Sequence, residues 1–78
     1  MFKNILRQIK DEKLKINLDN NKINIINYKE IKEVKDEIIK IDCNTFILNI
    51  YGENLIISKL LDMEVLILGK IKRIELVW

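Results

Sequence analysis

The strongest constraint on this chain is a change of hydrophobic period at Leu14. From there to the C-terminus, apolar side chains alternate with polar ones over one short run after another. A period of two places the apolar residues on one face of an extended strand, whereas a helix needs a period near 3.6. Proline is absent, so no run lacks a backbone donor for a sheet. The pattern predicts a single domain over residues 1–78, all-β from residue 14 to residue 78.

Turn signals separate these runs roughly every eight to twelve residues. Asn, Asp and Gly dominate them, because short polar side chains bond their own backbone and both Asn and Gly accept left-handed conformations. The predicted turns lie at residues 19–21, 35–36, 43–44, 52–54 and 61–64. This rhythm indicates an antiparallel meander or roll, or a small barrel, of about six to seven short strands.

One stretch, 28–42, fits two periods. Ile31, Val34 and Ile38 have helical spacing, but β-branched residues favour strands. Because everything that follows is strand-like, we expect two strands here, joined at Lys35-Asp36.

Two glycines are assigned structural roles. Gly52-Glu53-Asn54 separates two alternating runs, which predicts a hairpin connection with one residue at positive φ rather than a loop that grips a ligand. Further on, the apolar phase slips by one residue between Ile71 and Ile74. A slip of this kind is typical of a β-bulge, and Gly69 would mark the accompanying bend.

Residues 1–13 break the alternation and predict a short amphipathic helix. Phe2, Ile5, Leu6 and Ile9 follow the spacing i, i+3, i+4, i+7 of one helical face. Their full burial would contribute at most roughly 6–12 kcal/mol, and ordering the segment costs on the order of 10 kcal/mol. Membrane insertion alone would therefore be weak. We expect this face to dock against the sheet or a partner protein.

The last run, 65–78, is long and apolar and ends in a large aromatic residue. If the sheet does not close, an unpaired edge here is a template for pairing with another chain. Leu76 and Trp78 therefore join the candidate interaction residues. The strand is expected either to pair inside a closed roll or to carry an intermolecular contact, including self-association.

The composition offers no catalytic machinery. Histidine is absent, and Ser58, Thr45 and Cys43 are single residues of their kinds. Without a base beside a nucleophile, hydrolase-type catalysis is excluded, and one cysteine cannot build a thiolate metal site. Acidic pairs fall at predicted turns or at the helix end, where they solvate the chain. The sequence predicts a non-enzyme with no metal, cofactor or small-molecule substrate.

The charge pattern also disfavours nucleic acid, although a small nucleic-acid-binding barrel is the main rival interpretation. The formal net charge is only +2, and the lysines alternate with glutamates. Tyr28, Tyr51 and Trp78 are scattered instead of forming a stacking platform. One cysteine, no apolar stretch of about 20 residues and no signal-peptide pattern predict an intracellular protein, either soluble or peripheral to a membrane.

Three patterns give the chain a family resemblance. An I-x-I-x-x-Y run ends at Tyr28, the run L-x-I-x-G-x-N-L-x-I covers residues 48–57, and a related run with Gly69 at its centre covers residues 65–74. In this order the chain resembles the YabP/YqfC family of sporulation proteins over about residues 22 to 77. The paired glycines, with Asn54-Leu55 between them, carry most of the resemblance. The short N-terminus is more similar to the YqfC-like branch.

The resemblance implies a role in spore formation. Members are made in the mother cell of endospore-forming bacteria, have no known catalytic activity and go with membrane-associated sporulation proteins. It therefore implies a protein of the mother-cell cytoplasm, free or peripheral to the membrane around the forespore, that acts by protein–protein association during envelope assembly. No family binding residue transfers to this chain, so Gly52, Asn54 and Gly69 keep structural roles.

Overall fold

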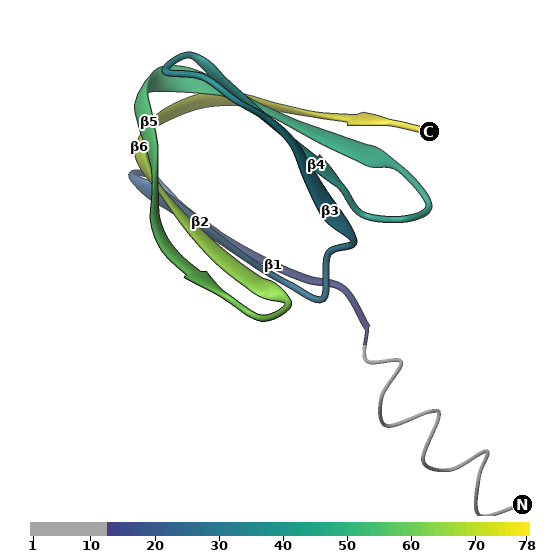
Figure 1. Ribbon diagram of the computed structural model, residues 1–78. Coiled ribbons are helices and arrows are strands. Elements are labelled where there is room, and N and C mark those ends of the chain that lie inside the picture. Colours follow the sequence, from purple (N-terminus) through teal and green to yellow (C-terminus); the bar gives the residue numbers. More distant parts are fainter. Residues whose placement is uncertain (1–12) are drawn as a thin grey trace, which may run out of the picture.

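The computed structural model describes residues 13–78 as six antiparallel strands in one open sheet (Figure 1). The strands are β1 (Lys15–Asp19), β2 (Lys22–Ile26), β3 (Glu30–Val34), β4 (Ile38–Asp42), β5 (Ile47–Leu61) and β6 (Glu64–Val77). The all-β prediction is confirmed. The predicted helix, with Phe2, Ile5, Leu6 and Ile9, lies outside the described residues.

The order of strands in the sheet is β1-β2-β6-β5-β4-β3. β3 to β6 form a meander, while the β1–β2 hairpin pairs with the far side of β6. β2 and β3 follow one another in the chain but lie at distant positions in the sheet. The arrangement is therefore a roll, and only its last four strands are a simple meander.

The sheet folds over because β5 and β6 are long enough to belong to two layers. Residues 47–51 of β5 pair with β4 in one layer, and residues 64–68 of β6 pair with β2 in the other. Both strands bend between these halves, so that β3 and β4 face β1 and β2 across the interior (Figure 1). The layer that holds β3 and β4 is called the upper layer below, and the layer that holds β1 and β2 the lower layer.

The core lies between the two layers. Alternation along the strands sends every second apolar side chain inward, where it leaves water. The largest fully buried side chains come from β2, β4, β5 and β6 and are Ile23, Ile25, Ile39, Ile41, Leu48, Ile50, Leu55, Val65 and Ile67. Tyr28 and Cys43 extend this cluster from the loops.

The prediction of a hairpin at residues 52–54 is wrong. These residues lie inside β5, at the bend, and the turn that joins β5 to β6 is at Asp62-Met63. One residue of the stretch does have positive φ, namely Asn54 at 54°. The register between β5 and β6 shifts between Glu53 and Ile56, so β5 carries one extra residue there. Gly and Asn favour bulges and turns for the same conformational reason, so local sequence does not separate the two.

The two glycines let the strands approach closely at the bend. A Cβ atom on Gly52 would overlap the carbonyl oxygen of Lys70. Gly69 has φ of 141°, and a Cβ atom there would lie 2.8 Å from the carbonyl oxygen of Asn54. The bulge predicted in the last strand is confirmed, because Tyr51 pairs with Arg73 while Gly52 pairs with Ile71, which leaves one extra residue in β6.

The remaining predicted turns are confirmed. Residues 20–21 join β1 to β2, and the stretch 28–42 contains the two strands β3 and β4, with a connection at residues 35–37. Residues 43–46 join β4 to β5, where Asn44 has φ of 81° and its N–H donates to the Asp42 carboxylate at 2.8 Å.

Candidate interaction surface

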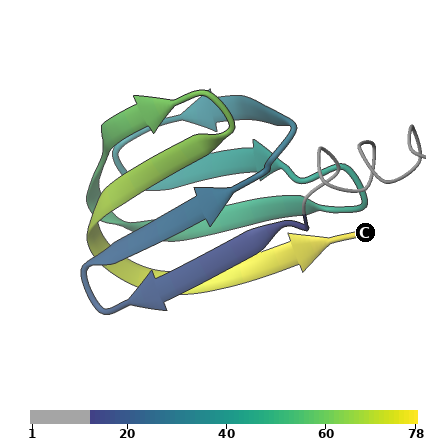
Figure 2. The ribbon, with the colours of Figure 1, turned by 90° about the horizontal axis from the view of Figure 1, so that it is seen from below.

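One side of the roll has unpaired strand edges in both layers. Residues 70–77 of β6 pair only with β5, and β1 pairs only with β2. Both edges lie on the same side of the molecule (Figure 2). A hollow of about 370 Å³ between them is lined by Leu18, Asp19, Asn20, Ile71, Lys72, Arg73 and Ile74. We call these two edges and the hollow between them the open side.

The register shows which backbone groups of β6 face outward. The N–H of Gly52 donates to Glu37 at 3.1 Å, so Gly52 points its backbone groups toward β4. Residues of a strand point these groups to alternate sides, so Tyr51 and Asn49 point toward β6. Their β6 partners are Arg73 and Glu75. It follows that Ile74 and Leu76 direct their N–H and C=O groups away from β5, along the open edge.

Apolar side chains on the open side face the interior but are not covered. Ile16 and Leu18 of β1 are paired with the buried Ile25 and Ile23, and they share their face. Their side chains are nevertheless 36% and 58% exposed. They face inward at the outermost strand of the lower layer, where the described chain leaves them open to water.

The upper layer shows the same feature at its edge. Ile74 and Leu76 are paired with the buried Ile50 and Leu48. Leu76 is 43% exposed. Trp78 follows β6 and is 83% exposed, and its ring contacts that of Phe46 with a centroid distance of 5.0 Å. Apolar side chains from both edges therefore line the hollow, namely Leu18 of β1 and Ile71 and Ile74 of β6.

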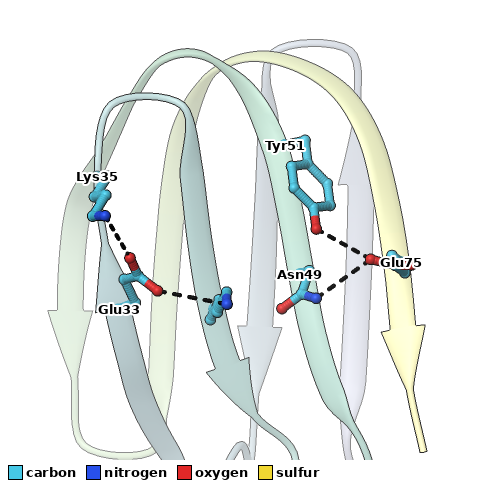
Figure 3. Close-up of polar contacts among 6 residues, drawn as sticks. Glu33, Lys35, Asn49, Tyr51 and Glu75 are labelled. Carbon is cyan, nitrogen blue, oxygen red and sulfur yellow. Dashed lines mark hydrogen bonds and ion pairs between the residues drawn. The ribbon is translucent and has the colours of Figure 1, made fainter.

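The outer face of the same β6 segment is polar and ordered by contacts (Figure 3). The Tyr51 hydroxyl donates to the Glu75 carboxylate at 3.1 Å, and the Asn49 amide donates to the same oxygen at 3.4 Å. The guanidinium of Arg73 lies 4.1 Å from the centre of the Tyr51 ring. These contacts hold Arg73 and Glu75 in place as two exposed, opposite charges on the edge strand.

A second charged group lies on β3 and β4 of the same layer. Glu33 pairs with Lys35 at 3.0 Å and with Lys40 at 3.7 Å (Figure 3). The hydrogen bond and charge of Lys35 lower the pKa of Glu33, and Glu33 in turn raises the pKa of Lys35. Exposed pairs of this kind add little stability. Their effect is to place one negative charge between two lysines, which reduces the positive charge of this face.

The thiol of Cys43, at the edge of the core, is kept neutral. Burial, with the nearby charge of Asp42, raises the pKa of Cys43 to about 11. Since the thiolate is the reactive form, this thiol is unreactive at neutral pH. Within residues 13–78, no group of three His, Cys, Asp or Glu side chains could hold a metal ion. The same part of the chain contains no helix long and apolar enough to cross a membrane.

The predicted interaction residues are distributed unevenly. Leu76 and Trp78 lie together on the open side, at the exposed end of β6. Gly52, Asn54 and Gly69 meet at the bend and shape the fold. Sequence reasoning missed Ile16 and Leu18, because their alternation predicts burial in the same way as that of the core strands. Arg73 and Glu75 were not assigned to this surface either, although their spacing of two places them on one face of the strand.

The described structure is that of a small open β-roll whose most distinctive surface is an edge with exposed apolar side chains. The model of the YabP family matches residues 10–77, and the chain belongs to this family. Membership fits a sporulation-associated protein. Comparison with curated proteins and with solved structures gave no significant match.

Proposed function

We propose that this protein acts by protein–protein association in the mother cell during spore formation and has no catalytic role. The observation that carries the proposal is the open side, where Ile16, Leu18 and Leu76 face the interior of a roll that does not cover them. Exposed apolar patches beside unpaired edges are typical of contact surfaces. Family membership supplies the sporulation setting.

The chemistry of the described residues supports association over catalysis. Cys43 is buried and protonated, and the carboxylates of Glu33 and Glu53 are engaged with lysines. The expected partner is a membrane-associated sporulation protein that offers an extended or apolar segment to the open side. The protein would then work in the mother-cell cytoplasm, free or at the membrane around the forespore.

The test replaces one apolar residue of the open side by lysine in sporulating cells. Leu76→Lys should lower both the yield of heat-resistant spores and the recovery of partner proteins by affinity capture. Ile56→Lys is the matched control, because Ile56 is 55% exposed and pairs with Leu68 in the other layer. Normal spores and unchanged capture with Leu76→Lys, at equal protein level, would contradict the proposal.

A salt series separates this function from nucleic-acid binding. Contacts to phosphates weaken steeply as salt rises, since bound counterions are released. Binding of the purified chain to single-stranded nucleic acid with such a dependence, unaffected by Leu76→Lys, would favour the rival.

A further inference from the structure

We propose that the open edge of β6 pairs with the same edge of a second copy, antiparallel, over residues 73–75 about a two-fold axis at Ile74. The inference rests on the proposed function, because it names one partner of the open side. It is argued from three properties of that edge, namely its backbone directions, its charges and its apolar inner face.

The backbone directions limit the possible registers. Only residues whose N–H and C=O point away from β5 can bond a new strand, and on the part of this edge that follows the bulge these are Ile74 and Leu76. In a symmetric antiparallel pair, the axis therefore passes through Ile74, through the neighbouring positions Arg73 or Glu75, or through Leu76 near the end of the strand. Regular pairing starts at Arg73, because the bulge lies immediately before it.

The charges select one of these registers. With the axis at Ile74, Arg73 of each chain lies directly opposite Glu75 of the partner subunit. The two-fold symmetry therefore gives two such pairs of opposite charges. An axis at Arg73 or at Glu75 would set two like charges against each other, which destabilises a sheet. An axis at Leu76 sets Glu75 against Val77 and leaves Arg73 unpaired. The Ile74 register therefore alone matches opposite charges, at non-hydrogen-bonded positions where the side chains lie closest.

The inner face then gains the cover that it lacks. A two-fold axis perpendicular to the sheet keeps the inner faces of both chains on the same side. The upper layers join into one sheet, and the openings of the two rolls face each other beneath it. Ile74 of one chain then lies directly opposite Ile74 of the other, and each Leu76 lies diagonally across from Ile74 of the partner subunit.

The test is sedimentation of the full chain with charge-reversed variants. The native chain should form dimers at micromolar concentrations. Arg73→Glu and Glu75→Arg should each weaken their own dimer at least about tenfold, or about 1.4 kcal/mol, because each sets like charges in direct opposition. Mixed in equal amounts, the two variants should form a heterodimer, since two glutamates of one chain then meet two arginines of the other.

Two further variants serve as controls for misfolding and for a general effect of net charge. The double variant Arg73→Glu/Glu75→Arg should restore the homodimer. Lys59→Glu changes the net charge as Arg73→Glu does, but it lies on β5 away from the open side, so its dimer should match the native one. Rescue by mixing cannot come from a variant that fails to fold, and it would not follow from a general charge effect.

Several results would overturn the pairing. The native chain could remain monomeric at all concentrations. This is the result expected if residues 1–12 cover the open side, or if the open side binds a different protein in the cell. The native chain could also dimerise without any response to the charge reversals. The proposed function fails separately: a normal spore yield with Leu76→Lys would refute it even if the dimer forms, and a monomer whose open side is still needed for sporulation would leave it standing.

Discussion

Replacing Gly69 by alanine tests the explanation of the bend most directly. Gly69 has φ of 141°, a conformation that costs a non-glycine residue roughly 1–3 kcal/mol. The added Cβ would also lie 2.8 Å from the oxygen of Asn54 and 2.9 Å from the Cα of Leu55. Ordinary contact begins at 3.4 Å, so β5 must move away by at least 0.6 Å, the difference between 3.4 and 2.8 Å.

That movement affects a well-packed site. Leu55 is only 2% exposed, and the bulge places it directly opposite Gly69. Overpacking of this kind costs about 1–3 kcal/mol. Together with the backbone strain, Gly69→Ala should lower the free energy of unfolding by about 2–6 kcal/mol. A chain of this length has about 4–12 kcal/mol in total, so the variant should be marginally stable or unfolded.

Urea denaturation followed by far-ultraviolet circular dichroism measures this effect. The control is Lys70→Ala, one residue along the same strand, where the side chain is exposed and nothing is overpacked. It should stay within about 0.5 kcal/mol of the native protein. If Gly69→Ala were as stable as Lys70→Ala, the close approach of β5 and β6 at the bend would be wrong.

Three further expectations follow from particular residues. Asn54 has φ of 54°, so Asn54→Ala should cost roughly 1–2 kcal/mol in urea denaturation while Asn54→Gly stays close to the native value; equal losses for both would contradict the bulge. The raised pKa of Cys43, about 11 against 9.0 for an ordinary thiol, means that the unfolded chain loses its proton first as pH rises. The contribution of the protonated Cys43 thiol to stability is therefore complete below pH 9 and lost between about 9 and 11. The free energy of unfolding of Cys43→Ser should therefore fall less steeply with pH over this range than that of the native protein. Identical slopes for the two proteins would refute the assignment. Trp78→Ala should change the stability of the monomer by less than about 1.5 kcal/mol, because its main contact is one aromatic pair, yet it should weaken self-association in sedimentation; a large loss of monomer stability would place Trp78 in the core instead.

The sequence by itself determined the class of fold. Alternation from Leu14 onward requires strands, because only an extended chain places every second side chain on one face. The phase slip after Ile71 located the bulge in the last strand. These features are local, and no distant part of the chain has to be known to infer them. Leu76 and Trp78 were predicted for the same reason, since an apolar strand end with no partner in sequence is visible locally.

The tertiary structure decided how the strands are used. Gly52, Asn54 and Gly69 produce a bend and not a turn, because the two layers must fold over one core and β5 must run through both. Ile16 and Leu18 have the pattern of core residues, yet their exposure follows from the position of β1 at an edge, which depends on its distant neighbour β6. The match between Arg73 and Glu75 likewise depends on which backbone groups point outward. Edges and registers arise from pairing between segments far apart in the chain, and such pairing has no local signature.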